Sequence, residues 1–504
     1  MANSKLREAI NEENKWGKTW NGEDALVTTS SKLLDFFGAS GSMRNADTMD
    51  KLNLFDGAFG EDKDAALKLL FYTRDVRGGY GERDTFNEIF AHLANINRES
   101  VSKNLWAVLE FGRAKDLYAL IGTKAEEDMW QFMREQFELD FNNMEQGKSV
   151  SLLAKWIATP DSKSDNTRAL GKKTASKLGY DFKHMSAYKK KLRALRKYLD
   201  LPEAKMATGK WDEIEYSKCA SKFLLTHRNA FKRHDADRYN EFINKVDSGE
   251  EKMHMDVVTP VDIMVKVRNN YSSDLETMWK ALPDNVDGNA LVMCDTSGSM
   301  WGWGYNGNVT PGDVAFALAM YIAERNKGDL KDLFMTFESN PHFLEFKGKT
   351  LPQKYQQFKN APWGGSTDLE AAFRLLLDTA VKHNLAQEDM PKSIIIVSDM
   401  QVNCVRGIEF NYEDRNGSPK VTFYDKMKMM YEQKGYNMPA VVFWNVNACG
   451  SANYHASASD NGVSMVSGYS TNILKQVFEN IGTTPYELMV KTVLENERYK
   501  EIIA

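Results

Sequence analysis

The spacing of apolar side chains changes character about halfway along the chain. Before residue 255, apolar residues recur every three or four positions, as Phe86, Ile89 and Phe90 do. This is the spacing of one face of an amphipathic helix. After residue 285, short apolar runs alternate with helical stretches, which is typical of βαβ units and a mostly parallel sheet. The predicted fold class is multidomain: an all-α part, then a doubly wound, Rossmann-like α/β part.

Short amphipathic helices are predicted throughout the first half. The pattern indicates helices from Val101 to Phe111, from Glu126 to Leu139 and from Ser151 to Ala158. Because one such helix pair cannot bury its apolar face alone, we expect a stack of HEAT-like pairs that forms a ring or a solenoid. Residues 1 to about 50 are polar and contain glycine, so we expect an extended or partly helical leading segment there.

Strands and helices alternate in the second half. Strands are expected at 291–294, 333–337, 342–346, 393–398 and 440–446, with a further short segment near 464–466. Helices are expected at 313–325, 369–381, 424–432, 472–481 and 485–503. These elements predict a helical domain over 1–280, an α/β domain over 285–483 and a C-terminal helix over 484–504.

Oxygen-bearing side chains follow the first of these strands. The apolar run ends in Asp295, Ser297 and Ser299, and open α/β sheets bind ligands outside the carboxyl ends of their strands. Oxygen ligands suit Mg²⁺, Mn²⁺ or Ca²⁺, and a shell with few carboxylates and room for water favours Mg²⁺. A strand-end turn with helix-capping residues is the alternative explanation, because Ser and Asp are favoured in both roles.

Two later segments supply further oxygens. Thr367 lies in the glycine-rich run Trp363-Gly-Gly-Ser-Thr-Asp, and Asp399 follows an apolar strand that ends in Ser398. In this order, Asp-x-Ser-x-Ser, Gly-Gly-x-Thr and strand-Ser-Asp resemble the metal-ion-dependent adhesion site of von Willebrand factor A domains. The resemblance implies that one Mg²⁺ is held by Asp295, Ser297, Ser299, Thr367 and Asp399. It also implies that an acidic side chain of a partner protein fills an open position on the ion.

Composition limits the partners and the compartment. The 504 residues carry a net charge of -5, so contact with a nucleic acid must come from local clusters of basic residues. Four cysteines without a Cys-x-x-Cys pair indicate a reducing, cytoplasmic setting without disulfides or thiolate zinc. No apolar run approaches the roughly 18 residues of a membrane span, and the first residues lack a signal-peptide core. A membrane is therefore not an expected partner.

Local clusters of basic residues do occur in the first half. Two successive predicted helices are rich in cations, and Tyr180, Phe182 and Tyr188 are interleaved with them. A lysine-rich helix face is usually only solvated, but two such helices with aromatic residues favour a phosphate-backbone partner. The candidate RNA-binding residues are Lys172, Lys173, Lys189, Lys190, Lys191, Arg193, Arg196, Lys197, Lys222, Arg228, Lys232, Arg233 and His234.

Several phrases in this half carry a second resemblance. They include Leu70-Phe-Tyr-Thr-Arg-Asp-Val-Arg-Gly-Gly-Tyr-Gly-Glu-Arg83, Ser151-Leu-Leu-Ala-Lys-Trp and Lys210-Trp-Asp-Glu-Ile. The chain resembles the DUF2828 family over roughly residues 30 to 480, and that family is similar in layout to the Ro60/TROVE proteins. The resemblance implies HEAT-like repeats, a von Willebrand factor A domain and binding of structured or misfolded non-coding RNA. Within the first phrase, 74–83 is predicted to be a helix–helix turn; a phosphate-binding loop is the alternative, although its spacing fits neither common fingerprint.

No motif for catalysis was found. The chain lacks a Gly-x-Ser-x-Gly elbow and a Walker loop, so no enzymatic activity is expected. The predicted function is an RNA-binding scaffold in which basic helices hold RNA and a Mg²⁺-binding A domain recognises a partner. An intracellular protein–protein adaptor that uses the metal site without RNA is the alternative, and a metal-dependent nuclease is a more distant one.

Overall fold

The computed structural model describes residues 14–286, 288–301, 309–362, 364, 366–403, 421–448 and 453–504. The chain forms two compact units, and each draws on separate stretches of sequence. The sheet unit comprises the chain up to Leu69, Gly78–Tyr80 and Val258–Glu497. The helical unit comprises Leu70–Arg77, Gly81–Val257 and Arg498–Ala504. Neither unit is one continuous stretch of the chain, and the expected domain limits at 1–280, 285–483 and 484–504 stay a prediction.

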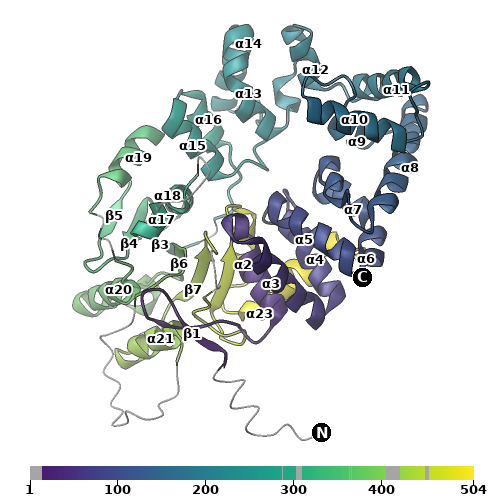
Figure 1. Ribbon diagram of the computed structural model, residues 1–504. Helices are drawn as coiled ribbons and strands as arrows, with labels where there is room; N and C mark the ends of the chain where they lie inside the picture. Colours follow the sequence, from purple (N-terminus) through teal and green to yellow (C-terminus); the bar gives the residue numbers. More distant parts are fainter. Residues whose placement is uncertain are drawn as a thin grey trace, which may run out of the picture. The chain divides into compact units, whose positions relative to one another are not determined.

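A six-stranded sheet forms the centre of the sheet unit (Figure 1), in the order β5-β4-β3-β6-β7-β8. Every neighbouring pair is parallel except β4 and β5, which are antiparallel. The strands are β3 (Ala290–Cys294), β4 (Leu333–Thr336), β5 (Phe343–Glu345), β6 (Ser393–Ser398), β7 (Ala440–Asn445) and β8 (Val463–Ser467). Every residue of β3 and β6 is buried, as expected for strands covered on both faces. The predicted mostly parallel sheet is confirmed.

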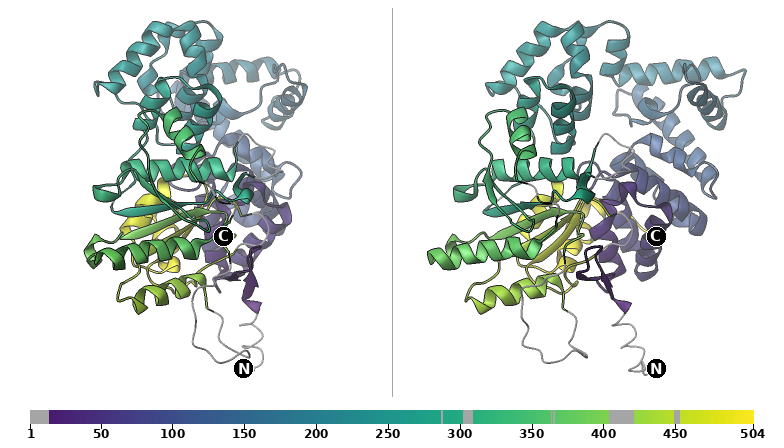
Figure 2. Two further views of the ribbon diagram at one scale, coloured as in Figure 1. Left: turned by 90° about the vertical axis from the view of Figure 1, so that its left-hand side faces the viewer. Right: turned by 60° about the vertical axis from the view of Figure 1, so that its left-hand side comes forward.

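Helices cover both faces of this sheet. The helix α18 (Pro311–Arg325) connects β3 to β4, whereas α20 (Leu369–His383) precedes β6 and α21 (Phe423–Gln433) connects β6 to β7. The first connection and the later ones cross the sheet in opposite directions. Because such crossovers are right-handed, α18 lies on the face opposite to α20 and α21. The views in Figure 2 agree, with the strands between α18 and the pair α20 and α21. α18 is buried along almost its whole length, since it also packs against α15 (Pro260–Asn270). The unit also contains α16 (Asp274–Lys280), α17 (Gly298–Trp301), α19 (Leu351–Lys359), α22 (Asn472–Glu479) and α23 (Pro485–Met489).

The leading segment belongs to the sheet unit and is more ordered than its polar sequence indicated. It forms an antiparallel hairpin of β1 (Trp16–Lys18) and β2 (Asp24–Leu26), then α2 (Lys32–Ser40) and α3 (Thr48–Glu61). α2 packs on β8, and the backbone N–H of Leu26 donates to the carbonyl of Tyr454 at 2.9 Å. The segment therefore packs on the sheet at its β8 edge.

The helical unit confirms the predicted helical first half. Its main helices are α5 (Arg83–Ile96), α6 (Arg98–Lys103), α7 (Leu105–Phe111), α8 (Glu126–Glu145), α9 (Leu153–Trp156), α10 (Asp165–Lys177), α11 (Met185–Tyr198), α12 (Pro202–Ala207), α13 (Ser221–His234) and α14 (Ala236–Asp247). The division between the two units falls within α4 (Lys63–Arg74). Their arrangement as HEAT-like repeats in a ring or solenoid stays a prediction.

The end of the chain departs from the single helix expected over 484–504. The α-helical turns of α23 are followed by a π-helical turn, Val490–Leu494, and a 3-10 turn, Glu497–Tyr499. The reason is that Arg498–Ala504 joins the helical unit. There the carbonyl of Ile503 accepts a hydrogen bond of 2.6 Å from the amide of Asn104.

The segment 74–83 connects α4 with α5, as a helix–helix turn would. Two of its charged side chains have partners within the helical unit. Arg74 donates to the carboxylate of Asp116 at 2.7 and 2.8 Å, and both side chains are buried. Asp75, also buried, accepts from the Tyr499 hydroxyl at 2.9 Å. These contacts give the segment a structural role.

Candidate functional site

The candidate site begins at the ends of two neighbouring strands. Asp295 follows β3 and Asp399 follows β6; the strands are parallel and in register, with Cys294 opposite Val397. After β3 the chain continues to β4 on one side, whereas after β6 it continues to β7 on the other. Loops that diverge in this way leave a crevice at the carboxyl ends of the strands, where α/β proteins bind ligands. Both carboxylates lie there, and both are buried.

Serine hydroxyls link the two carboxylates. The backbone N–H of Ser297 donates to Asp295 Oδ1 at 2.8 Å, and the hydroxyls of Ser297 and Ser299 lie 3.1 Å apart. Ser299 in turn hydrogen-bonds to Asp399, and Ser398 donates to Asp295 Oδ2 at 2.6 Å. The structure thus brings Asp295, Ser297, Ser299 and Asp399 together at one edge of the sheet.

The electrostatics of this cluster suit a cation. Burial, and then the nearby charge of Asp399, raise the pKa of Asp295 to about 7, although hydrogen bonds from Ser398 and Ser297 act in the opposite direction. Burial likewise raises the pKa of Asp399, and the hydrogen bond from Ser299 opposes this shift. A cation between two such carboxylates would remove both the burial cost and the repulsion.

The donor set fits a hard cation that keeps some of its water. Carboxylate and hydroxyl oxygens are the ligands that Mg²⁺ takes in proteins, usually with one or two carboxylates. Among the described residues, no group of three or more His, Cys, Asp and Glu side chains is placed to hold a metal. The residues present therefore fit Mg²⁺ better than a zinc or carboxylate-rich calcium site.

Thr367 lies in the loop that precedes α20 and is buried. Its hydroxyl is 2.8 Å from the carbonyl oxygen of Gln401 and 2.9 Å from Asn403 Oδ1. The loop is thereby tied to the segment that follows Asp399. No hydrogen bond within the described part of the chain joins Thr367 to the other four candidate ligands. Two neighbouring loop residues, 363 and 365, lie outside the described residues, as do residues 302–308 after α17.

Two contacts at the rim were not expected from the sequence. Glu338, just beyond β4, packs so closely on Gly364 that a Cβ atom there would overlap the carboxylate, which explains the need for glycine in that loop. From the leading segment, the Asn21 amide donates to the Thr367 hydroxyl at 2.8 Å. The glycine was a usable signal in the sequence, whereas nothing near Asn21 indicated its contact across 346 positions.

The structure separates the candidate RNA-binding residues into two groups. In the first, the charge already has a partner or is buried. Lys173 pairs with Glu126 at 2.7 Å, Lys189 with Asp161 at 2.5 Å and Lys191 with Glu138 at 2.6 Å. Arg196 donates to the carbonyls of Ala154 and Ile157 at 2.8 and 3.1 Å, and Arg228 is buried. Lys232 is half-buried. These side chains hold the helices together.

The second group faces solvent. Lys190, Arg193 and Lys197 are exposed at helical spacing on one side of α11, with no ion pair to another described residue. We call these three residues the α11 stripe. Near it in sequence, the side chain of Phe182 is 93% exposed. Lys172, Lys222, Arg233 and His234 are also exposed, and the His234 ring stacks on Trp211 with ring centroids 4.6 Å apart.

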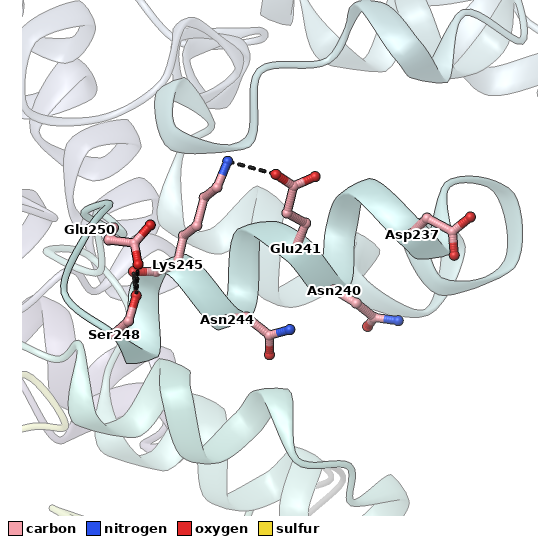
Figure 3. Close-up of a pocket in the computed structure, with 7 residues that line it drawn as sticks. All are labelled: Asp237, Asn240, Glu241, Asn244, Lys245, Ser248 and Glu250. Carbon is pink, nitrogen blue, oxygen red and sulfur yellow. Dashed lines mark hydrogen bonds and ion pairs between the residues drawn. The ribbon is translucent and has the colours of Figure 1, made fainter.

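Two cavities lie away from these residues. One, of about 490 Å³, runs along α14 and the turn after it (Figure 3). Its lining is polar, and Lys245 is paired there with Glu241 at 2.7 Å, so it offers no free positive charge for a phosphate. The other, of about 480 Å³, is lined by Lys392, Ala440 and Gly462. These residues lie at the amino ends of β6, β7 and β8, opposite to the candidate metal site.

The structure bears on two expectations from composition, namely the absence of disulfides and the absence of a membrane span. Cys219 and Cys294 are unpaired and buried, and the other two cysteines, Cys404 and Cys449, lie outside the described residues. No helix in the described ranges has both the length and the apolar content needed to cross a bilayer.

Comparison with known proteins finds two family models, one similar viral protein and one similar solved structure. A domain of unknown function, DUF2828, matches residues 19–145 and 129–290, and a second, DUF7788, matches 289–501. An uncharacterised protein of Acanthamoeba polyphaga mimivirus is 27% identical over 516 residues, which cover 94% of this chain and 86% of that protein. The crystal structure of the Deinococcus radiodurans Ro (RSR) protein matches 93% of this chain and 100% of its own, with a TM-score of 0.38 and 13% identity. Because the DUF2828 match extends over more than half of the chain, the protein belongs to the DUF2828 family.

Proposed function

We propose that the protein is a non-enzymatic scaffold that binds RNA through the helical unit and Mg²⁺ through the sheet unit. The observation that carries the RNA part is the α11 stripe. Three cations at positions i, i+3 and i+7 extend about 10 Å along one side of a helix. They are exposed, whereas Lys189 and Lys191 of the same helix form ion pairs with carboxylates. Exposed cations that form no ion pair with another described residue, together with the exposed Phe182 near them in sequence, suit a phosphate backbone with unstacked bases.

The test is a mobility shift of a structured RNA by the purified full chain. The variant Lys190→Glu/Arg193→Glu/Lys197→Glu should abolish the shift. The matched control, Lys331→Glu/Lys382→Glu/Lys434→Glu, reverses three exposed lysines of the sheet unit and should leave the shift intact. Binding that is lost equally in both variants would reflect net charge alone and would contradict the assignment. Wild-type binding should also weaken steeply as salt rises, because phosphate contacts release counterions.

The Mg²⁺ part of the proposal assigns Asp295, Ser297, Ser299, Thr367 and Asp399 to the cation. It is supported by the two buried carboxylates at adjacent strand ends, whose pKa values are raised. When bound, the ion would supply an electropositive site with an open position for a partner's carboxylate. The chain itself would hold the carboxylates of Asp295 and Asp399 at the ends of β3 and β6, and the three hydroxyl groups on the neighbouring segments.

Mg²⁺ binding is tested by titrating the full chain and following its melting temperature. Mg²⁺ should stabilise the wild-type protein, because a ligand that binds only the folded state raises its stability. Asp295→Asn and Asp399→Asn should remove this Mg²⁺-dependent increase and keep the fold, since each retains the side-chain shape. An unchanged increase in both variants would place the ion elsewhere.

A second candidate, a protein–protein adaptor without RNA, is favoured by one observation. Several of the predicted RNA-contacting cations are paired or buried, which leaves a smaller basic surface than the sequence indicated. If the adaptor is correct, the purified protein should carry no nucleic acid by its absorbance ratio. Reversal of the α11 stripe should then leave all binding unchanged, whereas Asp295→Ala should abolish capture of the protein partner.

A further inference from the structure

The tip of the N-terminal hairpin is fastened to the loop that follows Asp399. Thr19 Oγ1 donates to the carbonyl of Val402 at 2.7 Å, and the backbone N–H of Trp20 donates to Gln401 Oε1 at 2.9 Å. Thr19 is buried, whereas the Trp20 side chain is 94% exposed. Hydrogen bonds to the Val402 carbonyl and to the Gln401 side chain thus fix the turn, and they do not use the Trp20 ring.

The next residue of the tip, Asn21, bridges the two loops that carry candidate ligands. Its Nδ2 group donates to Thr367 Oγ1 at 2.8 Å and to the carbonyl of Gln401 at 2.5 Å. Thr367 lies in the loop before α20, and Gln401 is two residues beyond Asp399. One amide group from the start of the chain therefore holds both loops.

The hydrogen bonds of Thr367 leave it a single direction in which to bind an ion. A threonine hydroxyl has one proton and two lone pairs. The proton is directed at Gln401 O or Asn403 Oδ1, at 2.8 and 2.9 Å. One lone pair accepts from Asn21, so one lone pair remains for a cation. Without Asn21, the Thr367 hydroxyl could rotate, and the loop before α20 would lose one of the hydrogen bonds that hold it.

We propose that Asn21 is a positioning residue of the cation site, because its hydrogen bonds orient Thr367 and hold the two loops. The N-terminal hairpin would then contribute to the site in the sheet unit. This inference rests on the Mg²⁺ site assigned above. Partners that orient metal ligands through hydrogen bonds commonly affect metal affinity by about 10- to 100-fold. Mg²⁺ requires near-ideal octahedral geometry, whereas Ca²⁺ accepts irregular ligand sets. Loss of Asn21 should therefore weaken Mg²⁺ binding more than Ca²⁺ binding.

The experiment measures Mg²⁺ and Ca²⁺ affinity of the full chain by isothermal titration calorimetry. Asn21→Ala should weaken Mg²⁺ binding by about tenfold or more and Ca²⁺ binding by less. Trp20→Ala is the matched control, because it changes the adjacent residue of the same turn and keeps every hydrogen bond made by the backbone. This control should bind both ions as the wild type does.

Three other results would each contradict one of these assignments. If Asn21→Ala binds Mg²⁺ as tightly as the wild type, the positioning role is wrong while the Mg²⁺ site stands. If both ions are weakened equally, Asn21 only maintains the fold of the hairpin. If the wild-type protein binds neither ion, the proposed Mg²⁺ site is wrong, and the role of Asn21 is wrong with it.

Discussion

Arg498 donates two hydrogen bonds to the buried carboxylate of Asp75, 423 positions earlier in the chain, at 2.5 and 3.1 Å. Asp75 is fully buried, and 30% of the Arg498 side chain is exposed. Removing one partner of a buried ion pair leaves the other charge without compensation, which commonly costs 3–5 kcal/mol. We expect Arg498→Ala to destabilise the helical unit by about 3 kcal/mol, measured by urea unfolding.

The matched control for this prediction is Lys218→Ala. Lys218 pairs with Glu215 at 2.6 Å, but both side chains are more than half exposed, so the loss of this pair should change the stability of the helical unit little. If both variants lost the same small amount of stability, the last residues of the chain would not stabilise the helical unit.

Arg196 provides a test of the distinction between structural and RNA-binding cations. Its guanidinium donates to the carbonyls of Ala154 and Ile157, and hydrogen bonds from a charged group contribute about 1.5–3 kcal/mol. Arg196→Ala should therefore lower the free energy of unfolding by about 2 kcal/mol. Lys197→Ala, at the next and exposed position, should leave it unchanged. Equal effects on stability would contradict this assignment.

These residues show where inference from sequence succeeds and where it stops. The strand Ser393–Ser398 was predicted with its observed bounds, because a fully buried strand is a continuous apolar run between polar residues. Asp295, Ser297 and Ser299 were recognisable because their relation is local. Arg196 was placed on an RNA surface because a list of cations does not reveal which side of the helix meets a neighbour.

Contacts between distant parts of the chain could not be predicted from the sequence. Asn21 reaches Thr367 across 346 positions, and Arg498 reaches Asp75 across 423. Neither contact has a local pattern, since each depends on how separate stretches combine into one compact unit. Consecutive domain limits were expected for the same reason: sequence patterns describe neighbours along the chain.

His455 should make stability depend on pH. It is buried, and its ring Nε2 lies 3.0 Å from the carbonyl oxygen of Met400. Burial lowers its pKa from 6.5 to about 4. The unfolded chain therefore binds a proton more readily than the folded one between these values. The stabilising effect is complete above pH 6.5 and is lost as pH falls toward 4, by up to about 3 kcal/mol.

The measurement compares the wild type with His455→Gln, which cannot titrate in this range. The free energy of unfolding is determined at pH 5 and pH 7 for both proteins. All other titrating groups are shared, so the difference between the two pH dependences isolates His455. The wild type should lose about 2 kcal/mol more than the variant on acidification. An equal loss would mean that the imidazole is accessible to water.

Mg²⁺ affinity should also depend on pH, through Asp295. In the absence of a cation, its pKa near 7, against an ordinary value of 3.8, means that the folded protein binds a proton that the unfolded chain releases. This group therefore favours the folded state at acidic pH, and the effect is lost as pH rises from 3.8 through 7. Mg²⁺ needs the deprotonated carboxylate, so it competes with this proton.

The increase in melting temperature caused by a fixed Mg²⁺ concentration should be small at pH 6 and larger at pH 8. Asp295→Asn should show no increase at either pH, because it lacks the carboxylate that binds the ion. An increase that is the same at both pH values in the wild type would mean that Asp295 is not a ligand of the ion.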